Sequence, residues 1–157
     1  METAKITYND LFNRSVIVNS LPLSGIKGKP LCDIIMLRVD LNKLVDGFNK
    51  RMEEGLKKLK EEKFPKFDEE SQKPEADRCP EYKDWFEELE KLYSDMRADE
   101  AAKNMDAAAP KITREILTAF CEQGTDGVVP LPGDTDEKPN RLPKVTVLHM
   151  LAEMVED

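Results

Sequence analysis

The first chemistry to weigh in this sequence is a thiol beside an imidazole. His149 is the single histidine of the chain, and Cys121 is the cysteine we consider as its partner. A cysteine activated by histidine would be a nucleophile. No further residue completes such a site. We therefore prefer the simpler interpretation, in which both side chains belong to helices and carry no catalysis.

Three other patterns resemble ligand sites but lack essential parts. Asp84, Glu87 and Glu88 form a carboxylate cluster, but a di-metal site would need Glu-x-x-His repeats, which are absent. GDTDEKPN (133–140) alternates acids as a calcium loop does, without the 12-residue ligand spacing or the closing Glu. GIKGKP (25–30) lacks the spacer and the GKS/T of a phosphate loop. We expect no cofactor, no metal and no enzymatic activity.

Composition narrows the range of partners. The formal net charge is −8, which disfavours binding to phosphate groups over the whole surface, so we do not expect nucleic acid as a partner. No segment approaches the roughly 18 apolar residues that span a bilayer, and the N-terminus lacks the pattern of a secretory signal. Cys32, Cys79 and Cys121 have no CxxC spacing, which indicates free thiols in a reducing compartment.

Two long helices are the main elements that the hydrophobic spacing predicts. The first covers residues 30–63, beginning at Pro30 and ending before Phe64-Pro65. Its apolar residues recur in a heptad-like seam typical of coiled coils: Ile34, Leu37, Leu41, Leu44, Phe48 and Met52. The second covers residues 81–106, with Trp85, Leu89, Leu92 and Met96 on one stripe. The acidic residues 66–80 (KFDEESQKPEADRCP) join the two helices as a linker.

Shorter elements flank the long helices. Thr7 is a candidate N-cap for a helix that ends near residue 21. In the C-terminal subregion, residues 110–157, we favour a helix at 110–123 that stops at Gly124, although its Ile, Thr and Phe residues also suit a strand. Val128-Val129 would form either a short strand, adding minor β structure within 111–131, or a hydrophobic latch. Residues 145–155 close the chain as a helix.

The charge layout favours pairing of the two long helices. Residues 41–66 carry eight basic and five acidic side chains, a balance of +3, whereas residues 67–108 carry six basic and fourteen acidic, a balance of −8. Opposite bias and a linker of this length favour an antiparallel hairpin. The same charge pattern would also suit a heterologous contact between subunits, from the basic helix of one to the acidic helix of another. We predict a single domain over residues 1–157, mainly α, in which shorter N- and C-terminal helices pack one end of the hairpin.

Aromatic residues gather at the other end of this hairpin, where no neighbouring segment covers them. They form either a small local core or an anchor for a partner protein, because aromatic side chains dominate interface energetics. As partner-binding candidates we take the aromatic residues Phe64, Phe67, Trp85 and Phe86, with Lys57, Lys58, Lys60 and Lys63 as their charged complement.

The layout of the whole chain resembles that of small uncharacterised bacteriophage proteins encoded among virion and tail-module genes. The corresponding parts are an ITYNDL segment at 6–11, the lysine- and glutamate-rich helix at 41–62, the second helix at 85–96 and the closing helix at 145–155. The chain departs from that layout in its acidic linker and in PLPGDTDEKPN. The resemblance implies a structural or assembly role in a virus particle and carries over no catalytic residue.

We therefore expect a non-enzymatic structural or assembly protein of a phage particle, in its head, connector or tail. It would act through protein–protein contacts with virion subunits or copies of itself. It would be found in the virion, and in the host cytoplasm during assembly. The alternative is an acidic phage inhibitor or DNA mimic that binds a host factor, for which the acid-dense region 68–100 is the motivation.

Overall fold

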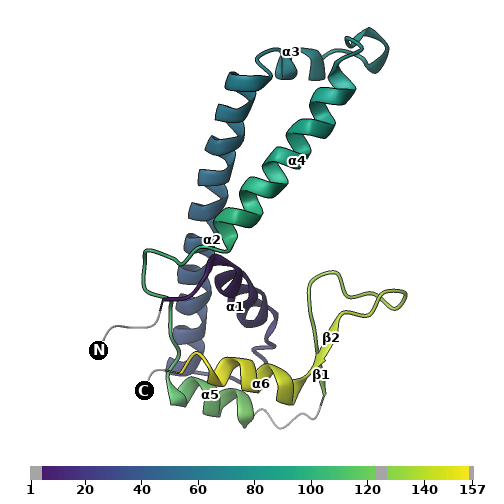
Figure 1. Ribbon diagram of the computed structural model, residues 1–157. Helices are drawn as coiled ribbons and strands as arrows, with labels where there is room; N and C mark the ends of the chain where they lie inside the picture. The colour runs from purple at the N-terminus through teal and green to yellow at the C-terminus, as the bar shows by residue number, and fades with distance from the viewer. Residues whose placement is uncertain (1–4, 123–126, 156–157) are drawn as a thin grey trace. The chain divides into compact units, whose positions relative to one another are not determined.

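The computed structural model describes residues 5–122 and 127–155 and confirms a mainly helical fold with a minor sheet (Figure 1). Along the chain its elements are α1 (Tyr8–Ser20), α2 (Lys29–Lys63), α3 (Phe67–Ser71), the 3-10 turn η1 (Glu75–Asp77), α4 (Tyr82–Ala101), α5 (Arg114–Cys121), β1 (Val128–Pro130), β2 (Arg141–Pro143) and α6 (Lys144–Ala152). The strands pair antiparallel, with Val129 opposite Leu142.

Packing contacts divide the chain into two compact units, and each is described by itself. The terminal unit comprises Met1–Val45 and Asn104–Asp157, and the hairpin unit comprises Asp46–Lys103. Helix α2 supplies its first part to the terminal unit and its last part to the hairpin unit. The sequence predicted a single domain over 1–157. Within that range the packing contacts separate the two units.

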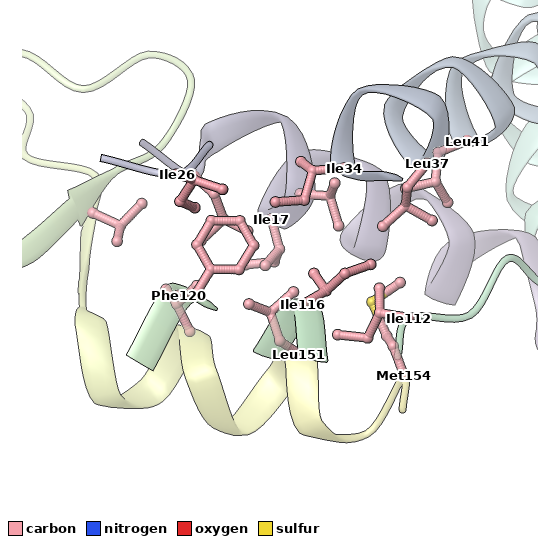
Figure 2. Close-up of a cluster of buried hydrophobic side chains, with 14 of the residues drawn as sticks. Ile17, Ile26, Ile34, Leu37, Leu41, Ile112, Ile116, Phe120, Leu151 and Met154 are labelled. Carbon is pink, nitrogen blue, oxygen red and sulfur yellow. The ribbon is translucent and has the colours of Figure 1, made fainter. Parts of the chain in front are cut away.

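The terminal unit has one apolar core, built from segments far apart in the sequence (Figure 2). Ile17 of α1, Ile34 of α2 and Phe120 of α5 all lie in it and are 4% exposed or less. Its remaining buried members are Leu11, Val18, Leu21, Ile26, Leu37, Leu41, Met105, Ile112, Ile116, Val129, Val147, Leu151 and Met154. The heptad-like seam of α2 is therefore buried in its first half, as its spacing indicated.

Local signals explain both ends of α1. Thr7 is the N-cap: its Oγ1 accepts a hydrogen bond from the Asp10 N–H, and an Asp10 carboxylate oxygen accepts one from the Thr7 N–H, each at 3.2 Å. This reciprocal capping box satisfies two orphan donors. At the other end, the Arg38 guanidinium donates to the carbonyls of Val18 and Leu21 at 3.1 and 2.8 Å. The last carbonyls of a helix lack i+4 partners, and besides Arg38 the Val18 carbonyl accepts a hydrogen bond from the Leu21 N–H at 3.4 Å. Arg38 therefore caps this end of α1 and fixes it against α2.

The C-terminal part of the terminal unit contains the helices α5 and α6 and the antiparallel strand pair β1–β2. Residues 110–123 contain helix α5, so the favoured assignment is confirmed, while the predicted stop at Gly124 lies outside the described residues. Thr113 caps α5 by accepting from the Ile116 N–H. A backbone hydrogen bond from Ile112 to Met154 closes the other end of this segment.

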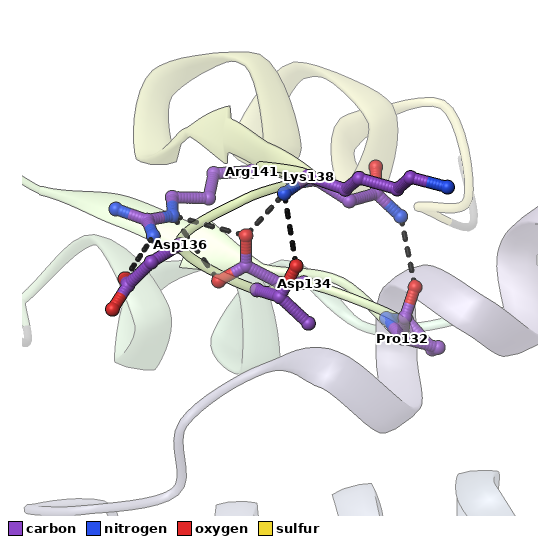
Figure 3. Close-up of polar contacts among 7 residues, drawn as sticks. Pro132, Asp134, Asp136, Lys138 and Arg141 are labelled. Carbon is purple, nitrogen blue, oxygen red and sulfur yellow. Dashed lines mark hydrogen bonds and ion pairs between the residues drawn. The ribbon is translucent and has the colours of Figure 1, made fainter.

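The loop between β1 and β2 is organised around one carboxylate (Figure 3). Asp134 accepts hydrogen bonds from the Asn140 backbone N–H at 2.7 Å and from the Arg141 guanidinium at 3.0 Å. The hydrogen bond from the Asn140 N–H, with a smaller contribution from Arg141, lowers the pKa of Asp134. Asp136 is also within 3.5 Å of Arg141. The acids that resembled a calcium loop are thus engaged by an arginine.

In the hairpin unit, the last part of α2 and the whole of α4 run antiparallel (Figure 1). Asn49, near the start of the α2 part of this unit, accepts a hydrogen bond at 3.3 Å from Arg97, near the end of α4. At the opposite end the rings of Phe64 and Trp85 lie 6.5 Å apart. Between these contacts the helices approach closely at Gly55, where an added Cβ would lie 2.9 Å from Met96 Cε. The predicted antiparallel helical hairpin is confirmed.

Helix α4 ends at Ala101, before the predicted end at residue 106. Beyond it the backbone becomes extended: the Met105 N–H donates to the Ile6 carbonyl at 2.8 Å, and Asn104 forms a bridge with Thr7. Met105 is 1% exposed in the core of the terminal unit. Burial of Met105 and pairing with the N-terminal segment therefore override the helix propensity of the alanine-rich sequence there.

Candidate functional site

The candidate site is the tip of the hairpin unit, residues 64–90, where a small aromatic cluster forms. Phe64 and Phe67 are 6% and 7% exposed, and Leu89 of α4 is buried with them. Leu56, Leu59, Tyr82, Trp85 and Leu92 pack around these three. The Phe67 ring stacks on Tyr82 at 5.1 Å and on Phe86 at 6.4 Å. The turn from α2 into α3 places both phenylalanines against the first turns of α4.

The four predicted aromatic residues come together, but they differ in exposure. Phe64 and Phe67 are buried and Trp85 is half-buried, whereas Phe86 is 49% exposed. The first three therefore form the local core that was one of the two interpretations of this patch. Phe86 has one face on that core and the other in solvent, so it is the aromatic residue of the set that a partner can reach.

The segment between the helices, expected to be a linker, is an ordered turn held by Glu70. This side chain is 8% exposed and accepts hydrogen bonds from Lys73 Nζ at 2.8 Å and from the Cys79 backbone N–H at 2.9 Å. The hydrogen bond from Lys73, followed by that from Cys79, lowers the pKa of Glu70. A carboxylate that accepts a backbone donor across the turn ties α3 to the start of α4.

Arg78 fixes the same turn from its other side. Its guanidinium donates to the carbonyls of Lys73 and Ser71 at 3.1 and 3.0 Å. Its Cζ also lies 4.8 Å from the centre of the Tyr82 ring. A cation above an aromatic face is a favourable contact, so Arg78 joins the backbone of the turn to the aromatic cluster.

An open groove of about 610 Å³ lies along this turn and the start of α4. Its walls combine Tyr82 and Phe86 with carboxylates, and the complete lining is Glu75, Arg78, Cys79, Tyr82, Lys83, Phe86, Glu87 and Glu90. Glu75, Glu87 and Glu90 are exposed and form no ion pair within the described part of the chain. We call this surface the tip groove. It suits an apolar group flanked by cations.

The four predicted lysines do not act as one set. Lys60 belongs to the cluster: its Nζ is 2.9 Å from Asp68 and 5.2 Å from the centre of the Phe67 ring. Lys57, Lys58 and Lys63 are exposed on α2 and do not line the tip groove. Lys60 therefore belongs to the tip cluster, while the other three lysines stay exposed on α2, and their predicted role in partner binding stays a prediction.

Sequence reasoning missed four residues that build the site: Glu70, Arg78, Cys79 and Tyr82. The acidic, proline-containing segment concealed the first three, because their role depends on contacts across a turn. Tyr82 had a usable signal, since it precedes Phe86 by four residues and a helix places such a pair on one face.

The other sequence candidates are not assembled into sites. His149 and Cys121 are both exposed, and neither forms a hydrogen bond to the other among the residues that the structure describes. Across residues 5–122 and 127–155, no group of three or more histidine, cysteine, aspartate or glutamate side chains is placed to hold a metal ion. Of the helices in that same part of the chain, none has the length and apolar character needed to cross a membrane.

Comparisons with protein families, with curated proteins and with solved structures found no match to this chain.

Proposed function

We propose that this protein is a non-enzymatic structural or assembly component of a phage particle, working through protein–protein contacts made at the tip groove. The exposure of Phe86 is the observation that supports this most directly. An aromatic ring half-open to solvent, beside a groove and backed by a buried cluster, has the character of an interface anchor.

The order of the tip also supports this proposal. Glu70 and Arg78 hold the turn through hydrogen bonds to its backbone, so the groove exists before any partner arrives. A preformed surface avoids much of the entropy that binding would otherwise cost. The phage setting, in head, connector or tail, comes from the resemblance in layout. The proposed locations are the virion and, during assembly, the host cytoplasm.

The test combines detection in particles with one substitution. Mass spectrometry of purified particles should find the chain, and immobilised protein should capture virion subunits. Phe86→Glu should reduce that capture at least about tenfold, the loss expected for an anchor residue. Ser94→Glu is the matched control, because it adds the same charge to an exposed position of α4 outside the groove. Absence from particles together with unchanged capture by the variant would refute the proposal.

A second candidate function is an acidic inhibitor or DNA mimic that occupies a basic site on a host factor. The observation in its favour is the exposure of Glu87 and Glu90 on α4, which form no ion pair among the residues that the structure describes, together with the −8 balance of residues 67–108. Such binding would weaken steeply as salt rises, because exposed charges are screened. Exchanging Glu87 and Glu90 for Gln would then abolish binding to the host factor, while Phe86→Ala would leave it intact. If Phe86 is instead the anchor of a protein–protein contact, Phe86→Ala is the change that should weaken binding most.

A further inference from the structure

A second apolar surface lies on the terminal unit, on the first part of α2. Ile35, Met36 and Val39 are 45%, 56% and 37% exposed. With the exposed Cys32 they recur at helical spacing and share one face, opposite the buried seam of Ile34, Leu37 and Leu41. We call Cys32, Ile35, Met36 and Val39 the α2 stripe.

Cations flank this stripe at both ends. Lys29 and Lys43 lie seven residues before and after Met36, so helix geometry puts all three on the same face, with each lysine about 10 Å from Met36 along the axis. Lys29 contacts Asp33 at 2.7 Å but keeps 71% of its side chain exposed. Residues 27–43 carry four basic and two acidic side chains, a balance of +2 in which Arg38 is bound to carbonyls at the end of α1.

The tip groove has the complementary arrangement. Its apolar centre is Tyr82 and Phe86, while Glu87 and Glu90 continue it along α4 and Glu75 lines it from η1. Residues 75–90 carry two basic and seven acidic side chains, a balance of −5. Arg78 and Lys83 also line the groove, and Arg78 is bound to two carbonyls of the turn, so three carboxylates stand against two cations there. An apolar centre between cations therefore matches an apolar centre with an excess of carboxylates.

We propose that the α2 stripe of one copy of this chain docks in the tip groove of the next copy, giving a head-to-tail assembly. This inference rests on the proposed function and names its partner as a second copy. Met36 is the residue that enters the groove, because its unbranched thioether adapts to an irregular surface and makes favourable contacts with aromatic rings such as Phe86. The lysines at its two ends meet the carboxylates of the groove.

Charge also argues against the simpler pairing of one stripe with another. An antiparallel pair centred on Met36 would set Lys29 of one helix opposite Lys43 of the other, and a parallel pair would set each lysine opposite its own copy. Both arrangements bring like charges together. The head-to-tail contact removes that repulsion, and because it joins two different surfaces it can add copies without closing.

The decisive experiment mixes two variants and measures mass by sedimentation. Wild-type protein should exceed a dimer of the 17.9 kDa chain as its concentration rises. Met36→Glu and Phe86→Glu should each be monomeric, with association weakened at least about tenfold. An equimolar mixture should form a dimer that grows no further, because one intact stripe and one intact groove remain. Ser94→Glu should behave as wild type.

A cysteine crosslink supplies a readout that requires no substitution in the contact. Cys32 belongs to the stripe and Cys79 lines the groove, so a short bismaleimide should join Cys32 of one copy to Cys79 of another in a Cys121→Ser background. Peptide mapping should find that pair, and its yield should fall at high salt.

Three results would overturn the inference: wild-type protein that stays monomeric at the highest soluble concentration, a crosslink joining Cys32 to Cys32, or association that survives Phe86→Glu. If the wild-type protein stays monomeric but captures a different virion subunit through the tip, the proposed function stands and that subunit is the occupant of the groove. Absence of the chain from particles, with head-to-tail association intact, would refute only the phage role.

Discussion

The carboxylate of Glu70 accepts a hydrogen bond from the backbone N–H of Cys79 at 2.9 Å, across the turn that joins the two arms of the hairpin. This single contact connects α3 to the residue that lines the tip groove immediately before α4. The same carboxylate is held by Lys73, so the position of the groove wall depends on one ionised side chain.

Acid should loosen the tip through Glu70. Its pKa is lowered in the folded protein, so its contribution to stability is complete above the unfolded value of about 4.3 and is lost as pH falls through the folded value. Glu70→Gln should remove this part of the pH dependence. The test is the protection factor of the Cys79 amide, obtained from hydrogen exchange at pH 7 and below pH 4 and corrected for the intrinsic exchange rate at each pH.

The control for that measurement is Glu69→Gln, at the exposed neighbouring position, which should leave exchange at Cys79 unchanged. Equal pH dependence in wild type and Glu70→Gln would contradict the assignment of Glu70.

The two stacked phenylalanines, Phe67 and Phe86, should contribute unequally to stability. Phe67→Ala removes a buried ring and should destabilise the hairpin unit by about 3–5 kcal/mol. Phe86→Ala removes a ring that is half in solvent and should cost about 1 kcal/mol. Urea unfolding followed by the fluorescence of Trp85, the single tryptophan, measures both. Equal losses would mean that Phe86 belongs to the core.

Two helical glycines of α2 should respond differently to alanine. A Cβ at Gly47 meets no atom within 4 Å, so Gly47→Ala should stabilise the helix by about 0.5–1 kcal/mol. At Gly55 the same Cβ would lie 2.9 Å from the Met96 methyl, which must move aside, so Gly55→Ala should gain less. Met96→Ala removes the methyl that this Cβ would meet. The double variant Gly55→Ala/Met96→Ala should therefore lose less unfolding free energy than the sum of the two single variants, which a double-mutant cycle measures.

The capping box of α1 should contribute measurably to the terminal unit. Thr7→Ala removes the acceptor of the Asp10 N–H and should lower stability by about 1 kcal/mol. Thr7→Ser keeps the hydroxyl and should stay close to wild type. Thermal unfolding followed by circular dichroism compares the three proteins, and an alanine variant as stable as the serine variant would show that this cap is dispensable.

The sequence by itself determined the elements whose signals are local. Thr7 begins α1, and the Phe64-Pro65 dipeptide ends α2, because caps and proline act within one helical turn. The three- and four-residue steps from Ile34 to Met52 also identified the buried face of α2, since that face follows from the helical period alone.

Only the tertiary structure decided which residues form the candidate site. The sequence brought Phe64, Phe67, Trp85 and Phe86 to one end of the hairpin, but their different exposures depend on how α3 folds back onto α4. The end of α4 at Ala101 likewise depends on Met105 pairing with a segment almost one hundred residues earlier. Propensity and periodicity describe neighbours along the chain, whereas burial and the tip groove arise from contacts between distant segments.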